Sequence, residues 1–132
     1  MPNQHINPAG LNTPSGYTHV VVATGGRTVY ISGQVSVNER GEVVGEGDLA
    51  AQMRQVYENL KAALAAAGAT FADVVKQTTY IVGFQPEQRA IVGEVRRQYL
   101  PAEDPPASTL VGVQALAAPA FLVEVEAIAV VG

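Results

Sequence analysis

Two glutamates stand two residues apart in the apolar run LVEVEAIAVV near the end of the chain. In a β-strand, residues i and i+2 lie on the same face, so we expect Glu124 and Glu126 to point the same way. A carboxylate that loses water has a raised pKa, which suits a general acid or base near neutral pH. The alternative is a structural arrangement, in which Lys76 or Thr78 on a neighbouring strand neutralises each acid. The pattern leaves both interpretations open.

Other polar groups with possible chemistry lie next to predicted strands. Tyr17 and His19 precede the first of them and offer a phenol and an imidazole, although a structural role is favoured for a lone histidine at a strand start. Ser32 and Gly33 end a strand, where a ligand can approach backbone amides. The Ser108-Thr109 pair supplies hydroxyls but has no adjacent base, and no GxSxG motif is present.

Several classes of site are excluded by composition and spacing. The chain has no cysteine, so disulfides and thiolate chemistry are absent. His5 and His19 have no carboxylate at ligand spacing, so we expect no metal site. The glycine-rich stretch 41–47 matches neither a P-loop nor GxGxxG, and no nucleotide or other cofactor is expected.

The candidate groups lie in strands, so a sheet must position them. The β-branched runs 19–23 and 28–32, separated by TGGR, predict a hairpin. Asp48 is a suitable N-cap for a helix whose apolar residues recur every three or four positions until Gly68. The remaining predicted elements follow in order: a Thr70 capping box, a strand over 75–82, a helix from Pro86 to Pro101, and strands over 108–113 and 121–131.

The order ββ(β)αβαββ predicts one α+β domain over residues 1–132, with a mixed sheet and two helices on one face. Residues 1–16, rich in Pro, Asn and Gly, predict an irregular lead-in. Two helices cannot cover both faces of a sheet with at least five strands, yet the runs 19–23 and 127–131 are apolar at odd and even positions alike. Both faces are therefore expected to be buried, and a second copy of the chain is the simplest cover.

The charge and hydropathy of the chain limit its expected partners and location. Only 15 % of the 132 residues are charged, which is little for a monomer surface and indicates that another subunit covers part of it. The net charge of −4 and the scattered basic residues disfavour nucleic acid as a partner. The N-terminus MPNQHINPAG has no basic or apolar segment and no apolar run could span a bilayer, so we expect a cytoplasmic protein with no membrane partner.

Five segments, taken together and in order, resemble the RidA/YjgF family, also called endoribonuclease L-PSP-like. They are GYTH at 16–19, VYISGQVSV at 29–37, GEVVGEGDLAAQMRQVYENLKAALAAAG at 41–68, DVVKQTTYIV at 73–82 and VEVEAIAVV at 123–131. The resemblance implies a chorismate-mutase-like fold assembled as a homotrimer, with three ligand clefts between subunits. It also implies hydrolysis of reactive enamines and imines, such as 2-aminoacrylate, to a keto acid and ammonia. Other members have been described as translation inhibitors or endoribonucleases.

The resemblance assigns roles to several residues. Tyr17 matches a tyrosine of the family's catalytic site, and Ser32 and Gly33 match its substrate-binding backbone. Glu124 matches the carboxylate that positions the attacking water.

One position departs from the family pattern. Ala107, followed by Ser108 and Thr109 in the substrate-binding segment, stands where active members carry the arginine of a PARS-like motif. That guanidinium pairs with the substrate carboxylate, and losing such bonds costs about 10- to 100-fold each. Gly93 stands where the family often has an asparagine. The other arginines that could reach the cleft are Arg89, Arg96 and Arg97.

The sequence therefore predicts a RidA-like trimer that hydrolyses an imine, an enamine or a related small molecule, with Glu124 orienting water. The usual 2-aminoacrylate-type carboxylates are not the expected substrates, because Ala107 replaces the anchor. A non-catalytic metabolite-binding trimer is the first alternative. An endoribonuclease is disfavoured by the acidic charge and by the lack of a histidine pair for acid–base cleavage.

Overall fold

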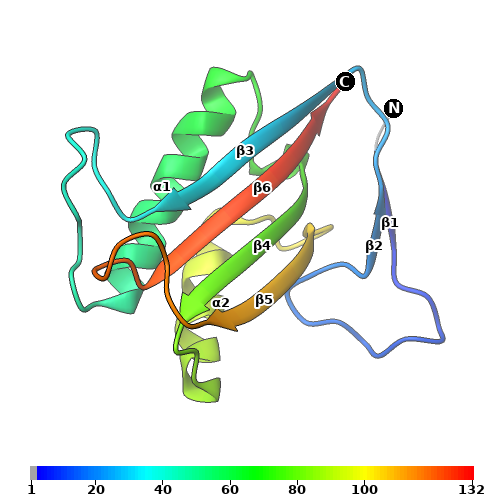
Figure 1. Cartoon of the computed structure of the whole chain (residues 1–132). Helices are drawn as coiled ribbons and strands as arrows, with labels where there is room; N and C mark the ends of the chain where they lie inside the picture. Colours follow the sequence, from blue (N-terminus) through cyan, green and yellow to red (C-terminus); the bar gives the residue numbers. More distant parts are fainter. Residues whose placement is uncertain (1–2) are drawn as a thin grey trace.

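The computed structural model describes residues 3–132 as a mixed four-stranded sheet with two helices on one face (Figure 1). Across the sheet the order is β3-β6-β4-β5, and only the β4–β5 pair is parallel. The predicted α+β class is confirmed. The elements of this layer are β3 (Arg27–Val35), α1 (Leu49–Ala66), η1 (Phe71–Asp73), β4 (Val74–Val82), η2 (Pro86–Gln88), α2 (Arg89–Tyr99), β5 (Ala107–Val113) and β6 (Val123–Val131).

Helix α1 begins and ends at the predicted residues. The Asp48 side chain accepts a hydrogen bond from the Ala51 N–H (3.1 Å), which satisfies one of the free donors of the first turn. At the other end Gly68 takes a left-handed φ of +73°, a conformation that costs glycine nothing. Its N–H and the next one bond back to the last turn, so the helix stops there.

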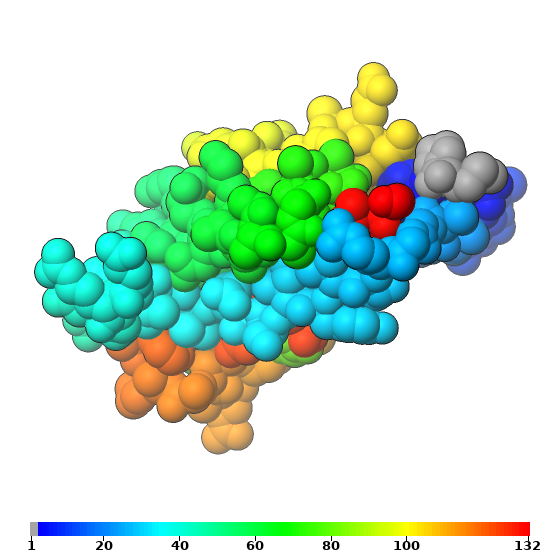
Figure 2. Space-filling model, turned by 90° about the horizontal axis from the view of Figure 1, so that it is seen from above, coloured from blue at the N-terminus to red at the C-terminus, as the bar shows by residue number. Residues whose placement is uncertain are grey.

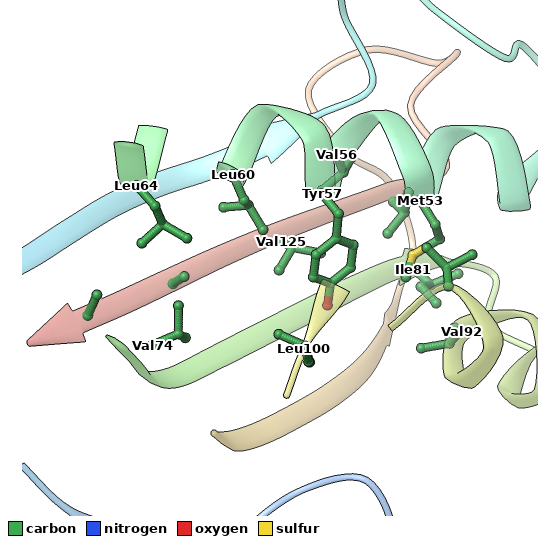
Figure 3. Packing of buried hydrophobic residues seen from close by; sticks show 14 of the residues in the cluster. Met53, Val56, Tyr57, Leu60, Leu64, Val74, Ile81, Val92, Leu100 and Val125 are labelled. Carbon is green, nitrogen blue, oxygen red and sulfur yellow. The ribbon is translucent and has the colours of Figure 1, made fainter. Parts of the chain in front are cut away.

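The hydrophobic core lies between the helices and the sheet (Figure 3). Met53, Val56 and Leu60 project from α1 at helical spacing and are at most 1 % exposed. They pack against buried residues of the strands, including Val125 on β6 and Ile81 on β4. The buried face of α1, which its helical periodicity defines, therefore packs on the buried face of the strands, where every second residue points inward.

The predicted hairpin between the runs 19–23 and 28–32 is wrong. Strand β2 (Val20–Val22) pairs with β1 (Gln4–Ile6) in a separate antiparallel ribbon. β3 pairs with β6 instead, so the main sheet has four strands rather than five or more. The lead-in predicted to be irregular contains β1, and Figure 1 shows the ribbon standing beside the sheet.

Side chains of the first residues hold β2 in the ribbon. The His19 N–H donates to Asn7 Oδ1 (2.8 Å), and the Thr24 N–H donates to Asn3 Oδ1 (3.1 Å). Backbone groups need such partners, and here the N-terminal segment supplies them. At Gly25 a Cβ atom would lie 2.7 Å from a Val130 side chain, so the missing side chain lets the chain pass close to β6 as it enters β3.

The connecting segments gather at opposite ends of the molecule. The segment of residues 36–48 and the segment of residues 114–122 lie at one end, and the β1–β2 ribbon lies at the other (Figures 1 and 2). No helix among residues 3–132 combines the length and the apolar character that crossing a membrane requires.

Candidate functional site

The face of the sheet that the helices leave open carries most of the candidate groups. Because Val123, Val125 and Ala127 of β6 are buried under the helices, the residues between them point to the opposite face. Glu124 and Glu126 therefore share this open face, as their spacing predicted. A shallow cavity of about 350 Å³ lies on it, and Ser32, Lys76, Thr78, Glu126 and Ile128 are among its lining residues.

Glu124 lies directly over Gly33. The β3–β6 ladder is irregular between Ile31 and Gln34, and this bulge carries Gly33. A Cβ atom at residue 33 would overlap Glu124 Oε2, so only glycine leaves room for the carboxylate in this position. Among residues 3–132 the one ion pair joins Arg40 and Glu42, so no cation of the described chain neutralises Glu124.

Glu126 has a different environment from Glu124. Its Oε2 accepts a hydrogen bond from the Tyr80 hydroxyl at 2.9 Å, and this bond raises the pKa of Tyr80. Lys76 Nζ donates to Thr109 Oγ1 at 2.6 Å instead of pairing with a glutamate. The structural alternative therefore applies to Glu126, but with Tyr80 as the partner in place of Lys76 or Thr78. In the described part of the chain, no three His, Cys, Asp or Glu side chains gather into a potential metal site.

Tyr17 and His19 lie in the segment before β2. His19 Nε2 is 2.7 Å from the Asn12 carbonyl oxygen, and its ring meets Tyr17 edge-on with centroids 5.2 Å apart. The imidazole therefore holds local structure, in agreement with the favoured interpretation. The Thr18 N–H donates to the Pro106 carbonyl (3.1 Å), which places neighbouring Tyr17 beside the start of β5.

The first residues of β5 alternate between the two faces of the sheet. Ala107 is the partner of Lys76 in the parallel ladder, and Thr109 bonds to the same lysine on the open face. Ser108 points to the helix side, where its Oγ lies 3.4 Å from the side-chain amide of Gln77. The open face therefore receives Ala107 and Thr109 but not Ser108.

The register separates the candidates into two groups. We call Ser32, Gly33 and Glu124 the glutamate half-site, and Tyr17, Ala107 and Thr109 the tyrosine half-site. On β4, Glu124 is opposite Tyr80 whereas Ala107 is opposite Lys76. At about 3.3 Å per residue these positions are about 13 Å apart along the strands, and Ala107 also lies two strands away from β6. A single chain does not bring the half-sites together.

The arginines considered as substitutes for the missing anchor lie elsewhere. Arg89, Arg96 and Arg97 line a cavity on the helix side of the sheet, whereas Glu124 lies on the open face. Sequence reasoning also missed Tyr80 as the partner of Glu126. The two-residue alternation along β4 places Tyr80 on the same face as Lys76, and this signal could have identified it.

A family model described as Endoribonuclease L-PSP matches residues 9–131, almost the whole chain. The chain belongs to this YjgF/RidA family. Protein DfrA of Myxococcus xanthus is 37 % identical over 114 residues, which cover 86 % of this chain and 84 % of that protein. A RutC family protein of Pyrococcus horikoshii is 40 % identical over 105 residues, or 79 % of each chain.

Solved structures of the YjgF/RidA family share the fold. A Rid family protein of Yersinia pestis, described as of unknown function, superimposes with a TM-score of 0.88 at 43 % identity, covering 99 % of this chain and 100 % of that one. RidA from an Antarctic Psychrobacter gives a TM-score of 0.70 at 33 % identity, with 91 % and 92 % covered. The family resemblance seen in the sequence is therefore confirmed.

Proposed function

We propose that the chain assembles as a homotrimer and hydrolyses a small imine or enamine in clefts between its subunits. In this arrangement the glutamate half-site of one subunit faces the tyrosine half-site of the next. The observation that supports the proposal is the separation of the two half-sites on one open face. A cyclic assembly repeats the same contact around its axis, so each cleft receives one half-site from each neighbour.

The chemistry follows from the position of Glu124. Its carboxylate, held over Gly33, accepts a hydrogen bond from a water molecule and takes a proton as the water oxygen attacks the carbon of the C=N bond. The nitrogen gains protons as the tetrahedral adduct collapses, so the imine and water become a carbonyl compound and ammonia. The backbone at Ser32 and Gly33 binds the substrate, and the Tyr17 hydroxyl reaches it from the neighbouring subunit. No step needs a cofactor.

Ala107 limits which substrates the proposed cleft can bind. A methyl group offers no charge and no hydrogen-bond donor, so it cannot hold a carboxylate as a guanidinium does. We therefore expect poor hydrolysis of 2-aminoacrylate and better hydrolysis of imines without a carboxylate next to the reacting carbon. The net charge of −4 also argues against RNA as the substrate.

The test compares two glutamates of one strand. Ammonia release is measured over a panel of small imines for the wild type, Glu124→Gln and Glu126→Gln. We expect Glu124→Gln to lower kcat/KM by at least about 100-fold, the scale of general acid–base catalysis. Glu126→Gln is the matched control, because an amide oxygen still accepts the Tyr80 hydrogen bond, and it should retain activity within a few fold.

Two outcomes would contradict the proposal. Saturable binding of panel members without turnover would favour a metabolite-binding trimer that uses the same cleft. RNA cleavage that persists through purification and is lost in Glu124→Gln would favour an endoribonuclease.

A further inference from the structure

The glutamate half-site lies close to the end of the β3–β6 ladder. After the bulge that carries Gly33, the ladder continues for two more pairs, and the last of them joins Val35 and Glu124. Strand β3 ends at this pair. Two pairs contribute few hydrogen bonds to define the register, and a slip of one residue would turn every side chain to the other face. Contacts outside the ladder are therefore needed to keep Glu124 over Gly33.

Asn59 of α1, on the other side of the sheet, holds the end of β3. Its Nδ2 donates to the carbonyl oxygens of Val35 and Val37, both at 3.0 Å. Its Oδ1 accepts from Gln55 Nε2 at 2.8 Å, and this bond fixes the orientation of the amide. The chain makes a tight turn between the two carbonyls, since the Val37 N–H donates to the Val35 carbonyl (2.8 Å). One side chain thus binds both sides of the turn that ends β3.

Gln52 of α1 holds the start of β6 in a similar way. Its Oε1 accepts from the N–H of Leu122, the residue directly before β6, at 2.9 Å. Its Nε2 donates to the carbonyl oxygens of Ala120 (2.9 Å) and Gly45 (3.3 Å), so the amide also joins two connecting segments at this end of the molecule. Gln52 is completely buried, and a buried amide needs these backbone partners as much as they need it.

The two amides lie on one side of the same helix. Gln52 and Asn59 are about two turns apart along α1. Helix α1 lies behind β3 and β6 in Figure 1, and its buried residues pack on both strands. The end of β3 and the start of β6 are therefore tied to a single helix, from the face opposite to Glu124.

We infer that Asn59 and Gln52 are positioning residues for the hydrolysis proposed above. Their hydrogen bonds hold β3 and β6 in the register that places Glu124 over Gly33, from the face opposite to the substrate. A displacement of about 1 Å at a reacting group can cost about 100-fold in rate. The inference rests on the proposed function for its effect on rate, whereas its effect on the position of Glu124 is independent of any reaction.

The kinetic test replaces the half-buried Asn59 with leucine. Asn59→Leu keeps the approximate size of the side chain and removes both donors. We expect kcat for imine hydrolysis to fall by about tenfold or more, measured well below the unfolding midpoint on a protein that circular dichroism shows to be folded. The matched control is Tyr99→Phe, which removes a 2.8 Å hydrogen bond to Glu58 of α1 without touching β3 or β6. It should keep the wild-type kcat.

A double-mutant cycle shows whether Asn59 acts through Glu124. Gly33→Ala by itself displaces the carboxylate, so adding Asn59→Leu should lower kcat by at most about twofold more. A residue that only stabilises the fold would act independently, and the two losses would multiply. Losses that multiply, or wild-type kcat in folded Asn59→Leu, would overturn the inference.

An NMR measurement without substrate separates this inference from the proposed function. In Asn59→Leu the side-chain carboxyl carbon resonance of Glu124 and the amide resonance of Gly33 should shift or split. The carboxyl resonance of Glu126, which Tyr80 holds, should stay unchanged. If these shifts occur but the wild type releases no ammonia from any imine, the hydrolysis is refuted and the positioning stands. Unchanged Glu124 and Gly33 resonances in folded Asn59→Leu would overturn the positioning even in an active enzyme.

Two further variants extend the test and guard against a folding defect. Gln52→Met removes the bond to the Leu122 N–H and should also shift the Glu124 resonance, so an unchanged resonance in the folded variant would contradict the role of Gln52. Gln55→Ala leaves both donors of Asn59 in place and removes only the bond that orients them. It should shift the Glu124 resonance in the same direction by a smaller amount, and no shift would count against the role of Asn59.

Discussion

Two glutamates on one strand differ because of the side chains around them. Glu126 accepts the hydroxyl hydrogen bond of Tyr80, which lies diagonally across the β4–β6 ladder, whereas Glu124 lies over a bulge where Gly33 has no side chain. A hydroxyl donor fixes the position of a carboxylate and occupies part of its hydrogen-bonding capacity. The second carboxylate keeps its oxygens for water or a ligand. The neighbours therefore decide which of two identical side chains is available for chemistry.

Gly33 gives a residue-scale prediction. In Gly33→Ala the new methyl group occupies the space of Glu124 Oε2, so the carboxylate must move. Because the end of a glutamate side chain can rotate away, we expect the protein to fold while its rate of imine hydrolysis falls by at least about tenfold. The measurement is kcat/KM together with the thermal unfolding midpoint.

Gly26→Ala serves as the control, because a Cβ at that position meets no heavy atom within 4 Å. Similar activity in Gly33→Ala and the wild type would show that the position of Glu124 over the bulge is not needed.

At the scale of elements, some helices and strands are specified by contacts between near neighbours in the sequence, and others by contacts with distant segments. Helix α1 is specified by its own residues, from the Asp48 cap to the left-handed Gly68. Strand β2 has no such specification, since its short run VVV suits any strand edge. The side chains of Asn3 and Asn7 accept hydrogen bonds from backbone N–H groups on either side of β2, and these bonds favour its pairing with β1.

The cap of α1 gives the prediction at this scale. Asp48→Ala removes the acceptor for the Ala51 N–H and should lower the free energy of unfolding by about 1 kcal/mol. Urea denaturation measures this difference. Glu46→Ala changes an exposed acid two residues earlier and should alter stability by less than about 0.5 kcal/mol. Equal effects of the two variants would mean that lost charge, and not the cap, is responsible.

At the scale of the whole molecule, residues 3–132 leave one face of the main sheet without a covering layer. Tyr30 on this face is 78 % exposed and Val111 is 38 % exposed. Large apolar side chains that are exposed on the open face of a sheet, here on its two edge strands, indicate an interface. The low charged fraction of 15 % agrees with such a cover. The proposed trimer would bury these side chains and complete the cleft in the same step.

Tyr30→Asp tests the assembly. In a single chain the side chain is mostly exposed, so the substitution should be tolerated by the fold. In the trimer it would bury an unpaired charge, which is strongly unfavourable. Sedimentation velocity at micromolar concentration should show a trimer for the wild type and a folded monomer for Tyr30→Asp. Ala62→Asp, on the exposed side of α1, should remain trimeric.

A wild-type chain that sediments as a stable monomer would refute the trimer and with it the cleft between subunits.

The sequence alone determined the features that depend on near neighbours. The cap and glycine stop of α1, the capping box at Thr70 and the shared face of Glu124 and Glu126 were all predicted and found. Each depends on residues within about four positions, where helix and strand periods define the geometry. The family resemblance was likewise readable, because its segments keep their order along the chain.

Only the tertiary structure decided which distant segments meet. It paired β2 with β1, separated Glu124 from Ala107, and placed Arg96 against Gln77 on the other side of the sheet. Strand pairing depends on residues far apart in the chain, and several runs of similar β-propensity compete for the same edge. The pairing that forms is the one that gives the most favourable backbone hydrogen bonding and burial over the whole fold. No local pattern in the sequence reports that total.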